Sequence, residues 1–229
     1  MRPSDLLPEP LDSTVVIDAA HLLVVVATDH EAAPFREAGL RTVVSGVGRV
    51  NAAVATTLAV QGLVSPPLVI ASGIAGSLPR ADVMSIGDVV IGDRAIAADE
   101  GIRTPTGFQS IAEMGFPLAR FMDDDAVRAD AGLVGWLESR LPGAVVGPIA
   151  TVGTCSGTDA AASELATRTG ALAEAMEGVG VLQAARLLGA RAAEVRVISN
   201  GTGDRVRQVW DLPSAFATLG TLATALASG

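Results

Sequence analysis

The sequence predicts an α/β fold: a three-layer α/β/α domain with a central mixed, mostly parallel sheet. Hydrophobic residues make up 49% of the 229 residues and charged residues 18%, so the chain can bury a large core. Apolar runs of strand length alternate along the chain with segments of helical character, which is typical of strands joined by helices. The longest of these runs are too short to cross a membrane, so we expect no membrane association.

The first elements follow from local composition. Residues 1–20 are expected to form a flexible arm before a single domain at 21–229, because no repeat or internal linker divides the chain. The run LLVVVA at 22–27 is continuously apolar, as in a strand covered on both faces. A short β-like run at 41–45 predicts the next strand. The segment rich in Ala, Val and Leu at 51–62 predicts a helix.

The later elements continue the alternation. Segment 86–98 carries strand signals, and 104–116 is polar, irregular and rich in glycine, which predicts a loop. Segment 123–140 predicts a helix with aspartates in its first turn, where the helix dipole favours them. The remaining predicted elements are strands at 68–71, 145–152, 171–176 and 194–199, and helices at 159–169, at 178–188 and from 211 onward.

Charge and composition exclude several classes of function. The formal net charge is −9 and no basic cluster offsets it, which argues against nucleic-acid binding. All 16 basic residues are arginine, so Schiff-base lysine chemistry and the lysine-containing phosphate loop are excluded. Cys155 is the single cysteine, which leaves no intramolecular disulfide and no multi-cysteine metal site. A single thiol is compatible with a reducing compartment, so we expect a cytoplasmic location.

Unusual residues gather where predicted strands end, which is where ligands bind in sheets of this kind. They lie in TDHE at 28–31, SGIAGS at 72–77, EAMEG at 174–178 and VRVISN at 195–200.

Each group also has an ordinary structural explanation. Glu31 and Glu177 are both candidates for carboxylates at helix N-termini. Gly73 and Gly76 are candidates for a strand-to-helix turn, and Asn200 for a left-handed turn residue.

Taken together, these groups can cleave a bond between a sugar and a base. One carboxylate can activate water, and a second can accept hydrogen bonds from sugar hydroxyls. An Asn side chain presents a donor and an acceptor to the edge of a heterocycle. Glu177 stands out because it lies between Met176 and the apolar run GVGVL, where a carboxylate without donors would be costly to bury.

The chain resembles the purine nucleoside phosphorylase/nucleosidase superfamily across residues 22–227. The motifs that carry the resemblance are SGVGRVNAA at 45–53, SGIAGSL at 72–78, IGDVV at 86–90, AMEG at 175–178 and RVISN at 196–200. Within the superfamily, the chain is most similar to the futalosine hydrolases of the menaquinone pathway. That closer similarity lies in Asn200, in WDLP at 210–213 and in TVGTCSGT at 151–158.

The resemblance implies catalytic roles for Glu31, Arg196 and Asn200. Glu31 matches the glutamate that orders and deprotonates the attacking water, and Arg196 matches an arginine that positions this water or its glutamate. Asn200 matches the residue that faces N7 and the 6-substituent of the purine.

The resemblance also implies a set of substrate contacts. Met176 and Glu177 match the pair at the ribose, where the carboxylate accepts from the 2′-hydroxyl, and residues 154–156 lie where backbone groups contact the purine. The substrate-binding residues expected on this basis are Gly73, Thr154, Cys155, Ser156, Met176 and Glu177.

Two positions depart from the pattern of the methylthioadenosine/S-adenosylhomocysteine nucleosidases. Those enzymes usually have Asp at the position of Asn200, and an Asp can protonate N7 and accept from a 6-amino group. The amide of Asn200 can instead donate to a 6-oxo oxygen and accept from protonated N7, which favours hypoxanthine over adenine. Ile74 stands where those enzymes often have a Ser near the water.

The resemblance therefore implies an N-ribosyl hydrolase of a small-molecule purine nucleoside, futalosine, acting as a homodimer or larger homo-oligomer. It implies no metal and no organic cofactor. The alternatives are a methylthioadenosine/S-adenosylhomocysteine nucleosidase, a purine nucleoside phosphorylase and a non-catalytic nucleoside-binding protein. Glu31 would repel a phosphate dianion, which favours hydrolysis over phosphorolysis, but Arg36 and Arg49 are candidate phosphate ligands.

Overall fold

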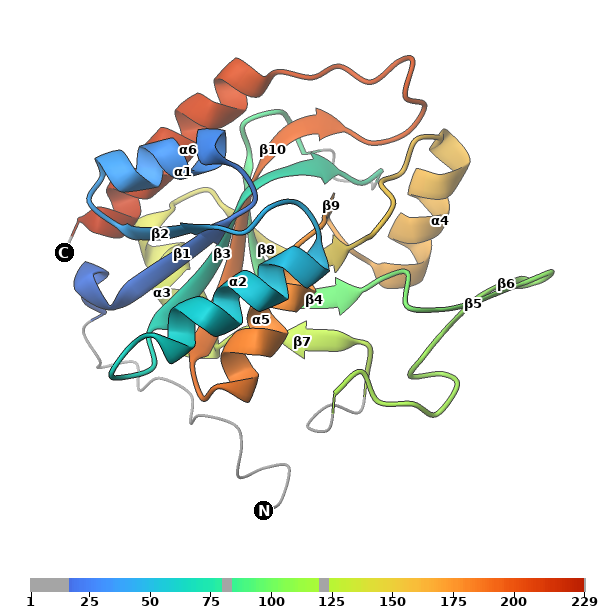
Figure 1. The fold of residues 1–229 in the computed structure, drawn as a ribbon. Helices are drawn as coiled ribbons and strands as arrows, with labels where there is room; N and C mark the ends of the chain where they lie inside the picture. Colours follow the sequence, from blue (N-terminus) through green and yellow to red (C-terminus); the bar gives the residue numbers. More distant parts are fainter. Residues whose placement is uncertain (1–16, 80–83, 120–123, 229) are drawn as a thin grey trace.

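The computed structural model describes residues 17–79, 84–119 and 124–228. Helices cover both faces of a central sheet, so the predicted three-layer α/β/α class is confirmed (Figure 1). The described strands are β1 (Leu22–Val26), β2 (Arg41–Val44), β3 (Leu68–Ser77), β4 (Val89–Ala97), β5 (Gly101–Thr104), β6 (Gly107–Ser110), β7 (Ala126–Arg128), β8 (Val145–Thr151), β9 (Ala173–Ala175) and β10 (Arg191–Gly201). The described α-helices are α1 (Asp29–Glu37), α2 (Arg49–Gln61), α3 (Ala131–Arg140), α4 (Asp159–Thr169), α5 (Gly178–Leu187) and α6 (Leu212–Ala227).

The sheet is mixed and mostly parallel, as predicted. Parallel pairings join β1 to β2 and β3, β3 to β10, β4 to β8, and β8 to β9. Antiparallel pairings join β4 to β10 and β7, and β3 to β9. Five strands form a closed ring of pairings: β3 pairs with β10, β10 with β4, β4 with β8, β8 with β9, and β9 again with β3. This part of the sheet therefore closes on itself. The closure places β9 and β10 on either side of β3.

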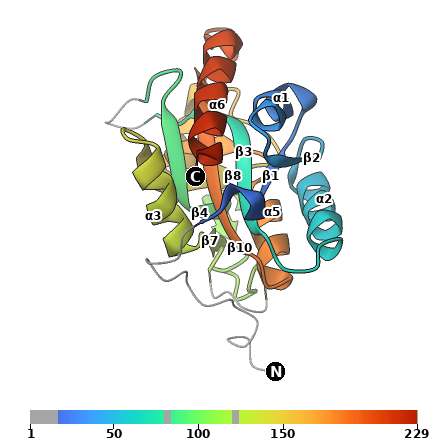
Figure 2. The ribbon, with the colours of Figure 1, turned by 90° about the vertical axis from the view of Figure 1, so that its left-hand side faces the viewer.

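Apolar clusters fill the space on both faces of the sheet. In β1, Leu22, Val24 and Val26 face the cluster that α1, α3 and α6 cover. Leu23 and Val25 face the cluster under α2 and α5. Figure 2 shows α3 and α2 on opposite sides of the sheet. This strand is therefore buried on both faces, as its continuous apolar run predicts.

The segment predicted as one helix at 123–140 is instead a strand followed by a helix, and residue 123 itself lies outside the described residues. β7 pairs with β4, and its Val127 is fully buried. Helix α3 begins only after Asp130, whose side chain caps it by accepting from Leu133 N at 3.0 Å. The predicted first turn with aspartates is therefore wrong, because this cap fixes the start of the helix at a later residue.

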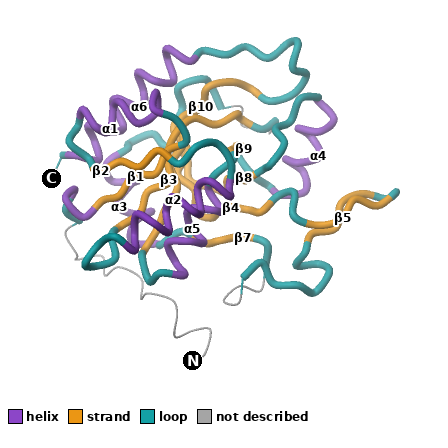
Figure 3. Tube along the Cα trace, viewed as in Figure 1, coloured by secondary structure: helices purple, strands orange, loops and turns teal. Residues whose placement is uncertain are grey.

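Other segments of the structure differ less from the elements that the sequence predicts. The predicted loop at 104–116 contains β6, which pairs with β5 in a hairpin that stands out from the body (Figure 3). Helix α1 has no counterpart among the predicted elements, and β3 and β10 extend beyond their predicted ends. Of the arm predicted at 1–20, residues 1–16 lie outside the described residues, whereas Ile17 is buried in the core. In the part of the chain that the structure describes, no helix combines the length and the apolar character needed to span a membrane.

Candidate active site

A cavity of about 560 Å³ opens where β1, β3 and β10 end. The segments after β1, the end of β3, β9 with the residues that follow it, and the end of β10 all contribute to its wall, and α6 closes one side. Its lining residues are Ala27, Thr28, His30, Glu31, Val47, Ile74, Ala75, Gly76, Cys155, Glu174, Ala175, Met176, Glu177, Ser199, Asn200, Trp210, Leu212 and Phe216. The strand ends that the sequence singles out therefore meet at one cavity.

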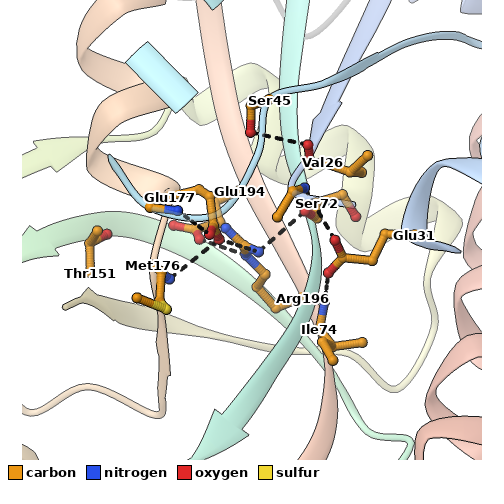
Figure 4. A network of polar contacts seen from close by, with 12 residues as sticks. Val26, Glu31, Ser45, Ser72, Ile74, Thr151, Met176, Glu177, Glu194 and Arg196 are labelled. Atoms are coloured by element: carbon orange, nitrogen blue, oxygen red, sulfur yellow. Dashed lines mark hydrogen bonds and ion pairs between the residues drawn. The ribbon is translucent and has the colours of Figure 1, made fainter. Parts of the chain in front are cut away.

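Glu31 is held rigidly at the start of α1. Thr28 and Glu31 form a reciprocal capping box, in which the Thr28 side chain accepts from Glu31 N and the Glu31 side chain accepts from Thr28 N. Glu31 Oε2 also accepts from Ala27 N at 3.1 Å and from Thr28 Oγ1 at 3.0 Å. Glu31 Oε1 accepts one bond, from Ile74 N at 3.0 Å (Figure 4). The helix-cap explanation is therefore correct for Glu31, and Oε1 still has a lone pair for a water proton.

Arg196 lies in a buried ionic network on β10 (Figure 4). Its Nε donates to Glu194 Oε1 at 2.9 Å, and its Nη1 lies 3.2 Å from Glu177 Oε2. Nη1 also donates to the carbonyl oxygen of Ser72 at 3.2 Å. Burial opposes the charge of Arg196, but the carboxylates of Glu194, Glu177 and Glu31 outweigh it and raise the pKa of the guanidinium. Arg196 therefore stays a cation that holds Glu177 in place.

Glu194 is the partner of Arg196 that sequence analysis misses. It is fully buried, and desolvation raises the pKa of its carboxyl although Arg196 acts in the opposite direction. Its Oε2 and Arg196 Nη2 have no hydrogen-bond partner among the described residues. A Cβ at Gly178 would clash with this carboxylate, so the glycine after Glu177 makes room for it. Glu194 and Arg196 are two positions apart in the sequence, so their side chains point to the same face of β10, and this spacing is the sequence signal for the pair.

Glu177 precedes α5 but does not cap it: its side chain makes no hydrogen bond to the amides of that helix. Its Oε1 instead accepts from Gly48 N at 3.0 Å, and its Oε2 accepts from Met176 N at 3.3 Å and pairs with Arg196. The helix-cap explanation is therefore wrong for Glu177. The buried carboxylate is fixed at the cavity wall beside Met176, where it can accept from a ligand.

Gly73 lies between Glu31 and Arg196 and is not among the residues that line the cavity. Its backbone φ is +131°, a value that residues with a side chain rarely adopt. A Cβ there would clash with Glu31 Oε1 and would lie 3.1 Å from Arg196 Nη1. Gly73 thus lets the two predicted catalytic side chains approach each other; a direct contact of Gly73 with substrate stays a prediction.

Asn200 presents an oriented amide to the cavity. Its Nδ2 donates to the carbonyl oxygen of Gly201 at 3.0 Å, and its Oδ1 accepts from Ser199 Oγ at 2.9 Å. Because a carbonyl oxygen only accepts, Gly201 fixes which end of the amide carries the donor. Among the described residues no non-glycine has a positive φ, so the left-handed turn explanation of Asn200 is wrong. One N–H and one oxygen lone pair of Asn200 remain for a ligand.

The segment expected to contact the purine is only partly at the cavity. Cys155 lines it, and burial, followed by the nearby charges of Glu174 and Glu177, raises the pKa of the Cys155 thiol. Cys155 and Ser156 also line an adjoining cavity of about 230 Å³. Thr154 is exposed and lines neither cavity.

A family model of the phosphorylase superfamily matches residues 23–228. This chain belongs to the phosphorylase superfamily. It is 42% identical over 153 residues to a futalosine hydrolase of Acidothermus cellulolyticus, a match that covers 66% of this chain and 61% of that relative. It is 33% identical over 179 residues to a futalosine hydrolase of Thermus thermophilus, with 76% of this chain and 75% of that relative covered.

Solved structures of superfamily members share the fold. One is a methylthioadenosine/S-adenosylhomocysteine nucleosidase of Neisseria meningitidis in complex with methylthio-immucillin-A, with a TM-score of 0.72 at 21% identity. The superposition covers 90% of this chain and 97% of the nucleosidase chain. A futalosine hydrolase mutant of Helicobacter pylori has a TM-score of 0.70 at 19% identity, and the superposition covers 90% of this chain and 94% of the mutant's chain. At these identities the likeness concerns the fold alone.

The two candidate phosphate ligands, Arg36 and Arg49, form ion pairs away from the main cavity. Arg49 pairs with Asp99 and Glu100, and these bonds outweigh its burial and raise the pKa of the guanidinium. Arg36 pairs with Asp29 on the surface. Neither arginine lines the main cavity, and none of the described residues that line it is an arginine.

Proposed function

We propose that this protein is a futalosine hydrolase, which cleaves futalosine into hypoxanthine and dehypoxanthine futalosine. The observation that carries the proposal is the convergence of Glu31, Glu177 and the oriented amide of Asn200 on one cavity. Relatives whose names give this activity support it, although the chain spans only 61% of the length of two of them. The expected absence of a metal or organic cofactor stays a prediction.

The arrangement suggests how the bond breaks. The electron pair of the bond between ribose C1′ and purine N9 goes to the base, which takes up a proton from solvent at N7, where Asn200 Oδ1 can accept from it; Glu31 later returns the proton of the attacking water to solvent, so that the step balances. Water bonds to C1′ and gives its proton to Glu31, whose Oε1 has the free lone pair. Glu177 accepts from the ribose and places negative charge near the developing cation.

Charge favours water over phosphate as the nucleophile. The carboxylates of Glu31, Glu174, Glu177 and Glu194 lie at or beside the cavity, and Arg196 is the buried cation among them. Such an excess of negative charge stabilises a cationic ribosyl group and repels a phosphate dianion. The network therefore supports hydrolysis rather than phosphorolysis.

A panel of three nucleosides tests the proposal. The enzyme is incubated with futalosine, inosine and methylthioadenosine, and the released bases are separated by chromatography. We expect hypoxanthine from futalosine at the highest kcat/KM and little adenine from methylthioadenosine. Preferential release of adenine would move the chain to the methylthioadenosine/S-adenosylhomocysteine nucleosidases. Binding without release of any base would favour the non-catalytic alternative.

We propose that the protein is a homodimer or larger homo-oligomer that uses α2. An apolar stripe along this helix and the residues before it is exposed: Val47 is 52%, Val50 73%, Val54 55% and Leu58 67% exposed. Exposed apolar side chains in a continuous stripe are typical of a protein interface. Leu58→Glu is expected to shift the mass measured by light scattering toward the monomer. Val64→Glu, at a fully exposed residue beyond α2, is the matched control.

A further inference from the structure

Arg49, the first residue of α2, holds segments together that are distant in the sequence. Its Nη1 donates to Glu100 Oε1 at 2.6 Å, and its Nη2 donates to Asp99 Oδ1 and, at 3.4 Å, to the carbonyl oxygen of Thr151. Asp99 Oδ2 in turn accepts from Gly153 N. Arg49 lines neither the main cavity nor the adjoining one. We call Arg49 with Asp99, Glu100 and Thr151 the Arg49 clamp, because it ties the start of α2 to the residues after β4 and to the end of β8.

Helix α5 fixes the start of α2 from another side. A Cβ at Gly180 would clash with the carbonyl oxygen of Arg49, so the two helices touch backbone to backbone at this point. Val179 N donates to Thr151 Oγ1 at 3.0 Å, and Thr151 is fully buried. Thr151 therefore binds α2 through its carbonyl oxygen and α5 through its hydroxyl, which holds the first turns of both helices at the end of β8.

The peptide group between Val47 and Gly48 is attached to this part of α2. Its carbonyl oxygen, on Val47, accepts from Asn51 Nδ2 at 2.7 Å, and Asn51 lies in the first turn of the helix. Its N–H, on Gly48, donates to Glu177 Oε1 at 3.0 Å. Because the N-cap of α2 is Gly48, no side chain caps the helix, and the contacts of Arg49 fix its start instead. The Arg49 clamp therefore decides where the Gly48 N–H lies.

The Gly48 N–H determines how the Glu177 carboxylate faces the cavity. Glu177 Oε2 accepts from Met176 N and pairs with Arg196 Nη1, so both of its lone pairs are engaged. Glu177 Oε1 has Gly48 N as its single donor among the described residues and keeps a second lone pair. Oε1 is therefore the oxygen that can accept from a ligand hydroxyl, and its one anchor is the peptide group at the start of α2.

We infer that Arg49 is a positioning residue for the ribose-binding carboxylate: the Arg49 clamp holds Gly48 N against Glu177 Oε1. The inference rests on the proposed function, in which Glu177 accepts from the ribose 2′-hydroxyl. The positive charge of Arg49 is balanced by two carboxylates of its own, so the arginine acts on Glu177 through the backbone and not through its charge. The planar guanidinium reaches several acceptors at once, whereas the ammonium of a lysine is one point on a flexible stem.

The test is a double-mutant cycle that measures discrimination at the 2′ position. The ratio of kcat/KM for futalosine to kcat/KM for 2′-deoxyfutalosine is determined in wild type, Arg49→Met, Glu177→Gln and the double variant. Arg49→Met is expected to lower this ratio at least about tenfold, as for a lost hydrogen bond to a charged group. In the Glu177→Gln background the same substitution is expected to change the ratio less than about twofold, because Arg49 acts through Glu177.

Further variants separate geometry from charge and from folding. Arg49→Lys keeps the charge but cannot reach all the acceptors, so its ratio is expected to fall as in Arg49→Met. Both substrates meet the same folded protein, so the ratio does not depend on how much of a variant folds. If Arg49→Met does not fold at all, Glu100→Gln weakens one contact of the clamp, and a fall of about two- to fivefold is expected. Arg128→Met, at an exposed arginine that pairs with Asp124, is the matched control with an unchanged ratio.

Three results would contradict the inference. A wild-type ratio in Arg49→Met, or in Glu100→Gln where that variant replaces it, would show that Gly48 N holds Glu177 without the clamp. An equal fall in both backgrounds would show that Arg49 acts apart from Glu177. Recovery of the wild-type ratio in Arg49→Lys would assign the effect to charge. If wild type cleaves futalosine, each of these results removes the inference alone; if wild type does not cleave it, the proposed function fails as well.

Discussion

Replacing Gly73 with alanine would test the geometry that joins Glu31 to Arg196. The added methyl group meets the Glu31 carboxylate on one side and the Arg196 guanidinium on the other. The backbone φ of +131° adds a conformational cost of about 1–3 kcal/mol for a residue with a side chain. Glu31 must then move, and the bond from Ile74 N to its Oε1 is lengthened or lost.

The expected loss of activity follows from this displacement. A catalytic group misplaced by about 1 Å can lower the rate about 100-fold, so kcat for futalosine in Gly73→Ala is expected to fall at least that much. The free energy of unfolding is expected to fall by about 1–3 kcal/mol, which corresponds to a Tm lower by several degrees.

The assay is hypoxanthine release under saturating substrate, with unfolding followed by calorimetry. Gly135→Ala is the matched control, because Gly135 lies in α3 with no atom within 4 Å of its added Cβ. That variant is expected to keep kcat and to gain about 0.5–1 kcal/mol of stability. A folded Gly73→Ala protein with the kcat of wild type would refute the reasoning.

Three further substitutions probe individual groups. Glu31→Gln is expected to lower kcat about 10²–10⁴-fold while nucleoside binding persists, as measured by titration, and a rate near that of wild type would remove Glu31 from catalysis. Glu177→Gln is expected to lower kcat and to reduce discrimination against 2′-deoxyfutalosine; an unchanged ratio of kcat/KM would mean that Glu177 does not contact the 2′-hydroxyl. Arg196→Met leaves Glu194 buried without its cation and is expected to lose about 3–5 kcal/mol of stability at pH 7 in denaturant unfolding. Burial raises the pKa of Glu194 in the folded state, so the contribution of this carboxyl to the free energy of unfolding is largest at low pH and is lost as pH rises. The loss of stability in Arg196→Met is therefore expected to shrink toward pH 5. A loss of stability that does not change with pH would contradict this.

The sequence predicts the parts of the site that depend on local motifs. The apolar run of β1 places Glu31 directly after a buried strand, and the Met176–Glu177 pair and Asn200 follow from their motifs at other strand ends. Glu31 and Asn200 meet at one cavity because strands β1, β3 and β10 are parallel and end at the same edge. Met176 and Glu177 reach the same cavity from β9, which runs antiparallel to β3.

The contacts that depend on pairing between distant strands are not predictable from these motifs. Glu174 meets Gly76 only because β9 pairs antiparallel to β3, where the sheet closes on itself. The bond from Gly48 N to Glu177 joins residues 129 positions apart. The start of α3 is misplaced for a different reason, since acidic residues before β7 imitate the first turn of a helix, whereas the cap at Asp130 decides.

The dependence of the reaction on phosphate tests the central claim most directly. Initial rates of hypoxanthine release from futalosine are measured with and without phosphate, and the sugar product is identified by mass spectrometry. Hydrolysis through Glu31 predicts equal rates and a sugar with a free anomeric hydroxyl. A rate that requires phosphate, with a sugar 1-phosphate as product, would contradict the account.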